Sequence, residues 1–121
     1  MNARQYCFNK SSRLLSSRDF TVVFDNPPFK VSHPQLLVLA KHANTPQSRL
    51  GLVIGKKNVK HAVHRNRLKR LIRESFRLKQ HNLPAIDAIV LARRGADTLS
   101  NAELFSILDK LWTRVARKAT K

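Results

Sequence analysis

The segment from residue 56 to residue 79, KKNVKHAVHRNRLKRLIRESFRLK, combines dense positive charge with a helical repeat of apolar residues. Ten of its positions are Lys or Arg, and Glu74 is its only acid. A helix turns by about 100° per residue, so residues three or four apart share a face. On such a helix, one side of residues 65–79 carries Leu68, Leu71, Ile72, Ser75 and Phe76. The opposite side carries Asn66, Lys69, Arg70, Arg73 and Arg77, with Arg65 and Arg67 at the two borders.

This pattern predicts a helix from about Val59 to Gln80, with Asn58 as its N-cap. The apolar side must pack on a core, and that packing turns the charged side outward. A charged side kept only for solubility usually mixes signs, with Glu placed four residues from Lys or Arg. Here Glu74 is almost alone, so like charges repel one another along the helix. A bound anion would offset that repulsion.

Four strands are predicted around this helix, at residues 29–33, 36–42, 49–55 and 86–92. The second and third are nearly continuous apolar runs, LLVLA and LGLVIG. The polar link ANTPQS between them predicts a hairpin loop.

A short helix precedes the strands and a longer one follows them. Ser16 or Ser17 can cap the first helix, and the run 26–28, Asn-Pro-Pro, ends it. Ser100 and Glu103 form an S-x-x-E capping box before the last helix. The apolar stripe of that helix is Leu104, Ile107, Leu108, Leu111, Trp112 and Val115.

The order helix, three strands, helix, strand, helix predicts a two-layer α+β sandwich. A chain of 121 residues fits one domain, 1–121, and its ends at 1–12 and 117–121 are expected to be mobile. The formal net charge is +17, from 24 basic and 7 acidic residues. Such a domain attracts polyanions, and Arg suits phosphate because it donates two parallel hydrogen bonds. RNA is therefore the predicted partner.

Other classes fit the residues less well. The seven acids are scattered, and no Ser/His/Asp arrangement can be placed, so a self-contained enzyme is not expected. His61 and His64 form H-x-x-H without a nearby third ligand, so no metal site or protein-bound cofactor is predicted. No apolar run reaches the roughly 18 residues of a membrane span. Cys7 is the only cysteine, which excludes an internal disulfide. We expect a cytoplasmic chain, with no membrane association and no protein partner.

The string K-K-N-x(6)-R-N-R-x-K-R-L-x-R-E-S-F, which spans residues 56–76, resembles the signature of the bacterial ribonuclease P protein subunit. Arg13-Leu14, Asp19-Phe20 and Val23-Phe24 look like the first helix of that family, and the resemblance covers about residues 12–115. It implies a fold like a domain of ribosomal protein S5, with a left-handed β-α-β crossover. It also implies an accessory subunit of a ribozyme that removes the 5′ leader from precursor tRNA. The active site and its Mg²⁺ ions would then belong to the RNA subunit.

Residue roles follow from the resemblance by position. Contacts with the catalytic RNA are implied for Lys56, Lys57, Arg65, Asn66, Arg67, Lys69, Arg70 and Arg73. Asn58 and Arg77 complete the predicted RNA-binding set. Phe20 and Phe24 would line a cleft for the leader of precursor tRNA, because aromatic faces stack on single-stranded bases. Two Phe four residues apart are also common in cores, and Leu39, where some relatives carry an aromatic residue, cannot stack.

Other classes of protein remain possible from the sequence. A ribosomal protein or general RNA chaperone would share the charge and the fold class. A DNA-binding helix-turn-helix protein or a membrane-surface helix fits less well, because the strands and the apolar side of residues 68–76 demand a packed sheet.

Overall fold

The strand β4 (Ile86–Ala92) lies inside a four-stranded sheet with the order β1-β2-β4-β3. The structure is a computed structural model that describes residues 17–43 and 46–120. Within these residues β1 (Phe29–Ser32) pairs antiparallel with β2 (Leu36–His42), and β2 pairs antiparallel with β4. β3 (Arg49–Val53) pairs parallel with β4 at the other edge, so the sheet is mixed.

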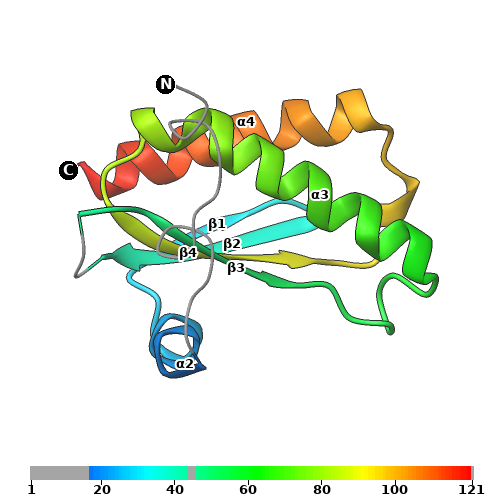
Figure 1. The fold of residues 1–121 in the computed structure, drawn as a ribbon, viewed down its shortest axis with the longest axis horizontal. Coiled ribbons are helices and arrows are strands. Elements are labelled where there is room, and N and C mark those ends of the chain that lie inside the picture. The colour runs from blue at the N-terminus through cyan, green and yellow to red at the C-terminus, as the bar shows by residue number, and fades with distance from the viewer. Residues whose placement is uncertain (1–16, 44–45, 121) are drawn as a thin grey trace, which may run out of the picture.

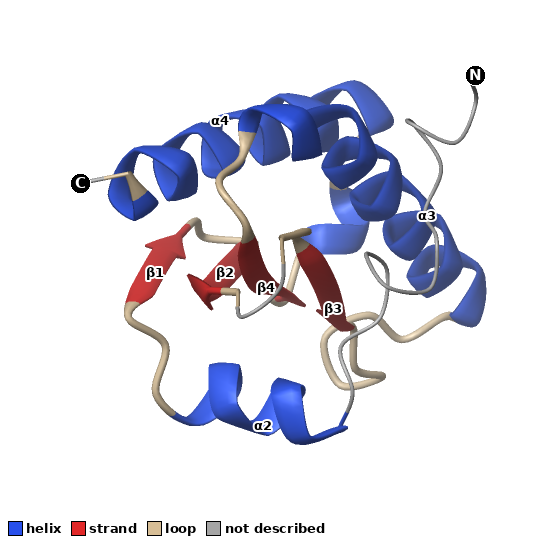
Figure 2. Ribbon diagram, turned by 60° about the vertical axis from the view of Figure 1, so that its left-hand side comes forward, coloured by secondary structure: helices blue, strands red, loops and turns tan. Residues whose placement is uncertain are grey.

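Among the residues that the structure describes, three α-helices cover the two faces of this sheet unequally. The helices α3 (Ala62–Lys79) and α4 (Asn101–Ala119) lie side by side on one face, and α2 (Ser17–Asp25) lies on the other (Figures 1 and 2). Short 3₁₀ turns, η2 (Gln80–Asn82) and η3 (Ala96–Thr98), follow α3 and β4. The predicted α+β class and element order are confirmed. The two-layer description is incomplete, because α2 contacts β2 and β4 from the far side and forms a partial third layer.

The predicted hairpin between the second and third strands is wrong. β2 and β3 are separated by β4, and each of them pairs with β4 instead. The physical reason is the composition of β4, in which six of seven residues are buried. A strand so apolar on both faces is most stable between two neighbours, so it takes the central place. The link after β2 therefore crosses to the far edge of the sheet.

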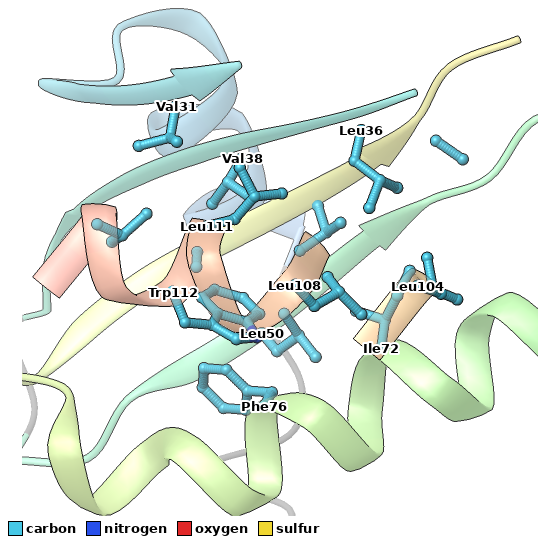
Figure 3. Packing of buried hydrophobic residues seen from close by; sticks show 14 of the residues in the cluster. Val31, Leu36, Val38, Leu50, Ile72, Phe76, Leu104, Leu108, Leu111 and Trp112 are labelled. Atoms are coloured by element: carbon cyan, nitrogen blue, oxygen red, sulfur yellow. The ribbon is translucent and has the colours of Figure 1, made fainter. Parts of the chain in front are cut away.

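The main core lies between the sheet and the helices α3 and α4. Figure 3 shows Phe76 of α3 beside Trp112 of α4, with ring centroids 5.4 Å apart in an edge-to-face arrangement. Both side chains are fully buried. The indole Nε1 of Trp112 donates a hydrogen bond of 3.0 Å to Ser75 Oγ, so the buried polar groups satisfy each other. The apolar sides predicted for both helices are thus confirmed, since the buried α3 residues are Leu68, Leu71, Ile72, Ser75 and Phe76.

The start of α3 differs from the prediction. The helix begins at Ala62 rather than near Val59, and His61 occupies the N-cap position without a side-chain cap. Val59 is fully buried in the core, so the segment before α3 packs on the sheet and the helix begins only after it. Asn58 is not the cap, because its side-chain nitrogen donates to the Ala92 carbonyl, 3.0 Å away, at the end of β4.

Other element ends shift by smaller amounts. β1 ends at Ser32 and β3 at Val53, each earlier than predicted, whereas β2 and β4 match their predicted ranges. α4 continues to Ala119, so part of the tail expected to be mobile is helical. The expected mobile segment 1–12 lies outside the described residues.

The capping box at the start of α4 is confirmed. Ser100 Oγ accepts a hydrogen bond of 3.1 Å from the Glu103 backbone N–H. Glu103 Oε1 accepts one of 2.9 Å from the Ser100 backbone N–H. These bonds favour the ionised carboxylate, so they lower the pKa of Glu103 below its ordinary value.

We expect Ser100→Ala to destabilise the domain by about 1 kcal/mol, because it removes the N-cap acceptor of α4. The measurement is the free energy of unfolding in urea. Ser106→Ala, the same change at an exposed position inside α4, is the matched control and should leave stability within about 0.5 kcal/mol. Equal losses in the two variants would contradict a role for the cap.

Candidate nucleic-acid interface

The outer side of α3 presents cations that the packing of its inner side holds in place. Arg70 and Arg73 are exposed, and so is Asn66 between the two border arginines. Within residues 17–43 and 46–120, neither Arg70 nor Arg73 forms an ion pair or a hydrogen bond with another side chain or with the backbone. Uncompensated guanidinium groups on a rigid helix can each donate paired hydrogen bonds to one phosphate.

Arg65 bonds back to the loop that precedes α3. Its Nη1 atom donates to the carbonyl oxygens of Val59, at 3.0 Å, and Lys60, at 2.8 Å. This loop also carries Lys56 and Lys57, which are both exposed in a turn after β3. Arg65 therefore fixes the loop that presents two other cations of the predicted set.

Arg67 reaches in the other direction, to the segment before α4. Its Nη1 donates to Asn101 Oδ1 at 2.7 Å, and its Nη2 donates to the carbonyl oxygens of Asp97 and Leu99 at 3.2 and 3.0 Å. Gly95, with a φ of 92°, makes the left-handed turn that brings this segment round after β4. Arg67 thus ties α3 to the start of α4.

The remaining members of the predicted set differ in their surroundings. Lys69 is half-buried on α3, and Asn58 is exposed although its side chain bonds to β4. Arg77 lies next to Glu74, and its Nε donates to Glu74 Oε1 at 3.1 Å. A second bond joins Arg77 Nη2 to Glu74 Oε2. The charge of Arg77 is therefore largely neutralised within the helix, whereas those of Arg70 and Arg73 are not.

The two phenylalanines proposed for the leader cleft both belong to α2, on the other face of the sheet. Phe24 is 44% exposed, although it follows the fully buried Val23. Val23 packs with Leu39 and Ile89, so Leu39 is part of a small core under α2. Phe20 precedes Phe24 by one turn, and its side chain lies outside the described residues.

Charged groups of the strands lie on the same face of the sheet as α2. Asp87 is buried and accepts hydrogen bonds from Arg49 Nε and Nη2 at 2.9 and 2.8 Å. Lys41 Nζ lies 4.0 Å from the same carboxylate. Sequence reasoning did not single out this group, because only the pairing of β4 with both β2 and β3 brings the three residues together.

The described residues were also searched for metal-binding groups and for membrane-spanning helices. Among them, no three His, Cys, Asp or Glu side chains lie close enough together to hold a metal ion. The rings of His61 and His64 meet in an edge-to-face arrangement, with centroids 5.9 Å apart. Among the described helices, none has the length and apolar character that crossing a bilayer requires.

The structure thus defines a basic α+β domain with an exposed cationic helix face. A family model described as Ribonuclease P matches residues 8–116. A Saccharophagus degradans protein called Ribonuclease P protein component is 58% identical over 118 residues, which cover 98% of this chain and 87% of that protein. A Pseudomonas aeruginosa protein of the same name is 53% identical over 110 residues, which cover 91% and 82%.

Solved structures agree with this match. The RNase P protein of Staphylococcus aureus superposes with a TM-score of 0.79 at 28% identity, over 87% of this chain and 95% of that one. The RNase P protein of Thermotoga maritima gives a TM-score of 0.70 at 28% identity, over 88% and 96%. The chain belongs to the ribonuclease P protein family, as the resemblance in residues 56–76 implied.

We expect Arg67→Lys to destabilise the RNA-free protein by about 1–3 kcal/mol, because lysine cannot replace the three bonds to Asn101, Asp97 and Leu99. Arg70→Lys is the matched control on the same helix and should stay within about 0.5 kcal/mol. Urea unfolding without RNA measures both. If Arg67→Lys is as stable as Arg70→Lys, the bonds from Arg67 do not hold α4.

Proposed function

We propose that this chain acts as the protein subunit of ribonuclease P and takes part in maturation of the tRNA 5′ end by binding RNA. The observation that carries the proposal is the pair Arg70 and Arg73, exposed on a helix whose inner side is buried. Membership of the family supports the assignment to ribonuclease P. Catalysis and its Mg²⁺ ions belong, in this proposal, to the RNA subunit.

The α3 face binds catalytic RNA through phosphate neutralisation. Each Lys or Arg that contacts a phosphate releases condensed counterions, and this release favours association. A folded helix holds the guanidinium groups before RNA arrives, so less conformational entropy is lost on binding. The proposed contact set keeps all the predicted residues: Lys56, Lys57, Asn58, Arg65, Asn66, Arg67, Lys69, Arg70, Arg73 and Arg77.

The members of this set contribute in different ways. Arg70 and Arg73 donate directly to phosphates. Arg65 and Arg67 spend donors on backbone carbonyls, but a guanidinium has five N–H groups and keeps its charge. They hold the neighbouring loops and add to the positive field at the same time. Arg77 contributes least, because Glu74 offsets its charge.

The leader of precursor tRNA is bound on the other face of the sheet, beside α2. The exposed ring of Phe24 offers a stacking surface for unpaired bases, and Phe20 lies one turn earlier on the same helix. Leu39 contributes packing under α2 and no stacking. Binding the catalytic RNA on the α3 face and the leader beside α2 would let the subunit hold the precursor against the catalytic RNA.

Two finer points follow from family membership. We infer that the parallel unit β3-α3-β4 has the left-handed crossover and the ribosomal protein S5-like arrangement that the resemblance implies. We also infer that the chain works in the cytoplasm, together with precursor tRNA. An experimental structure and the cellular location of a tagged chain would test these points.

Reconstitution tests the function as a whole. A bacterial ribonuclease P RNA is incubated with precursor tRNA at low Mg²⁺, with and without this chain. We expect leader removal to become faster with the chain, because neutralised phosphates reduce the need for Mg²⁺. RNA binding without any stimulation would indicate a general RNA chaperone instead.

We expect Arg70→Gln to weaken binding to the catalytic RNA by about tenfold, which corresponds to the loss of one charged hydrogen-bond contact. Arg77→Gln, the same substitution on the same helix, removes a charge that Glu74 already offsets and should change affinity much less. Both affinities are measured by filter binding or fluorescence anisotropy. Equal losses would show that net charge, rather than the exposed face, determines binding.

We expect Phe24→Ala to lower the preference for leader-bearing precursor over mature tRNA by about 1 kcal/mol or more, since the stacking surface is lost. Val22→Ala, on the same helix and also exposed, is the control and should keep the preference. Competition between the two RNAs for the reconstituted holoenzyme measures it. A folded Phe24→Ala protein with unchanged preference would remove Phe24 from the leader site.

A further inference from the structure

The exposed face of α3 changes in character along the helix. Arg70 and Arg73 lie in its middle, whereas Val63 and Asn66 lie in its first two turns. Asn66 comes three residues after Val63 and four before Arg70, so the helical repeat places these three on one face. The face therefore begins with two uncharged side chains and continues into the cationic part. We call Val63 and Asn66 the uncharged end of the α3 face.

The side chain of Asn66 is available to a partner. Asn66 is exposed, and within residues 17–43 and 46–120 its carboxamide forms no hydrogen bond. Two other asparagines have internal roles. Asn58 donates to the Ala92 carbonyl oxygen, and Asn101 accepts from Arg67. Asparagine is also a poorer helix former than lysine or arginine, so the folding of α3 does not explain an asparagine at this exposed position.

Val63 is unusually exposed for an apolar residue. Its exposed fraction of 70% is the largest among the large apolar side chains of the described residues. A β-branched side chain loses rotamer freedom in a helix, so valine also lowers helix propensity. At this position it adds little packing and no helical stability to the RNA-free protein. A single exposed apolar residue is common on protein surfaces, but Val63 adjoins an unbonded carboxamide on a helix face that is otherwise cationic.

The arginines on either side of Asn66 hold this part of α3 in place. Arg65 is bonded to the loop before α3, and Arg67 is bonded to the segment before α4 and to Asn101. Asn66 lies between them in sequence, so a turn that is tied to two neighbouring segments presents its side chain. A ligand that binds there orders little additional backbone, which reduces the entropy lost on association.

Hydrogen-bond chemistry separates Asn66 from the cations of the same face. Lysine and arginine side chains only donate hydrogen bonds, and phosphate oxygens accept them. The carbonyl oxygen of a carboxamide is an acceptor, so it needs a partner with an N–H or O–H group. In RNA such groups belong to base edges and to the ribose 2′-hydroxyl, and the phosphodiester has none. The isopropyl group of Val63 likewise suits the apolar surface of a ribose or base rather than a phosphate.

We propose that the uncharged end of the α3 face contacts the nucleoside part of one nucleotide of the catalytic RNA. Asn66 accepts a hydrogen bond from the 2′-hydroxyl or from a base amino group of that nucleotide, and Val63 packs against its ribose or base. This inference rests on the proposed function, because it assigns the ligand chemistry within the same RNA-binding face. Phosphate contacts alone carry no sequence information, so the uncharged end determines where along the RNA the helix binds.

The test measures binding of the full chain to a bacterial ribonuclease P RNA over a range of salt concentrations. The variants are Asn66→Ala and Val63→Ala, and both positions are exposed, so the fold is retained. Asn82→Ala, in η2, and Leu78→Ala, roughly 22 Å beyond Val63 along α3, make the same kinds of change elsewhere on the surface. We expect losses of at least about fivefold for Asn66→Ala and about threefold for Val63→Ala, and of less than about twofold for the two controls.

The salt dependence shows whether the lost contact is to a phosphate. Arg70→Gln should reduce the slope of log affinity against log salt by about 0.7–0.9, whereas Asn66→Ala and Val63→Ala should leave the slope unchanged. A slope reduced to the same extent by Asn66→Ala would assign Asn66 to a phosphate and overturn the proposal. Losses no larger than those of the controls would overturn it as well. Failure of the natural chain to bind the RNA would instead refute the proposed function.

Analogue interference identifies the group on the RNA that Asn66 contacts. One pool of the RNA carries scattered 2′-deoxynucleotides, and a second pool carries scattered bases that lack their exocyclic amino group. RNA that the protein binds is separated from RNA that it does not bind. We expect one analogue site that weakens binding of the natural chain and has no effect on binding of Asn66→Ala. Such a site in the first pool assigns the 2′-hydroxyl, and one in the second pool assigns a base, whereas its absence from both pools overturns the proposal.

Discussion

The contact between α3 and α4 around Trp112 determines which way the cationic face points. Phe76 and Ser75 of α3 meet the indole ring through an edge contact and a hydrogen bond of 3.0 Å. All three side chains are buried, so rotating α3 would expose a large apolar area and leave the indole N–H unsatisfied. This inner packing holds Arg70 and Arg73 in solvent despite their mutual repulsion. The function of the outer side therefore depends on the inner side.

The arginines of the family signature have two kinds of surroundings. Arg65 donates to carbonyl oxygens of the loop before α3, and Arg67 donates to the segment before α4 and to Asn101. Arg70 and Arg73 have no partner among the described residues. A cation that fixes a loop still contributes to the field around it, so loss of function at Arg67 would combine two causes. Stability measured without RNA separates them, because a phosphate contact does not exist in that state.

Much of the fold could be predicted from periodicity. The apolar stripes of both long helices, the ranges of β2 and β4, and the capping box at Ser100 follow from local patterns that burial and backbone hydrogen bonding enforce. The order of the strands could not be predicted in the same way. The pairing of β3 with β4 joins residues far apart in sequence, and a hairpin was the simpler local choice.

The candidate site was predictable to a similar degree. The charge pattern indicated which face of α3 is exposed, because helical phase alone places Arg70 opposite Ile72. It could not show that Arg67 bonds to Asn101, since that contact depends on where the turn at Gly95 carries the chain.

We propose that the pre-formed cationic face of α3 binds RNA through its phosphates. The most direct test is the affinity of the chain for ribonuclease P RNA over a range of salt concentrations. Counterion release predicts that the logarithm of the association constant falls linearly with the logarithm of salt, by about 0.7–0.9 for each phosphate neutralised. We expect a slope that corresponds to several phosphates. A slope near zero, with affinity retained, would contradict the account.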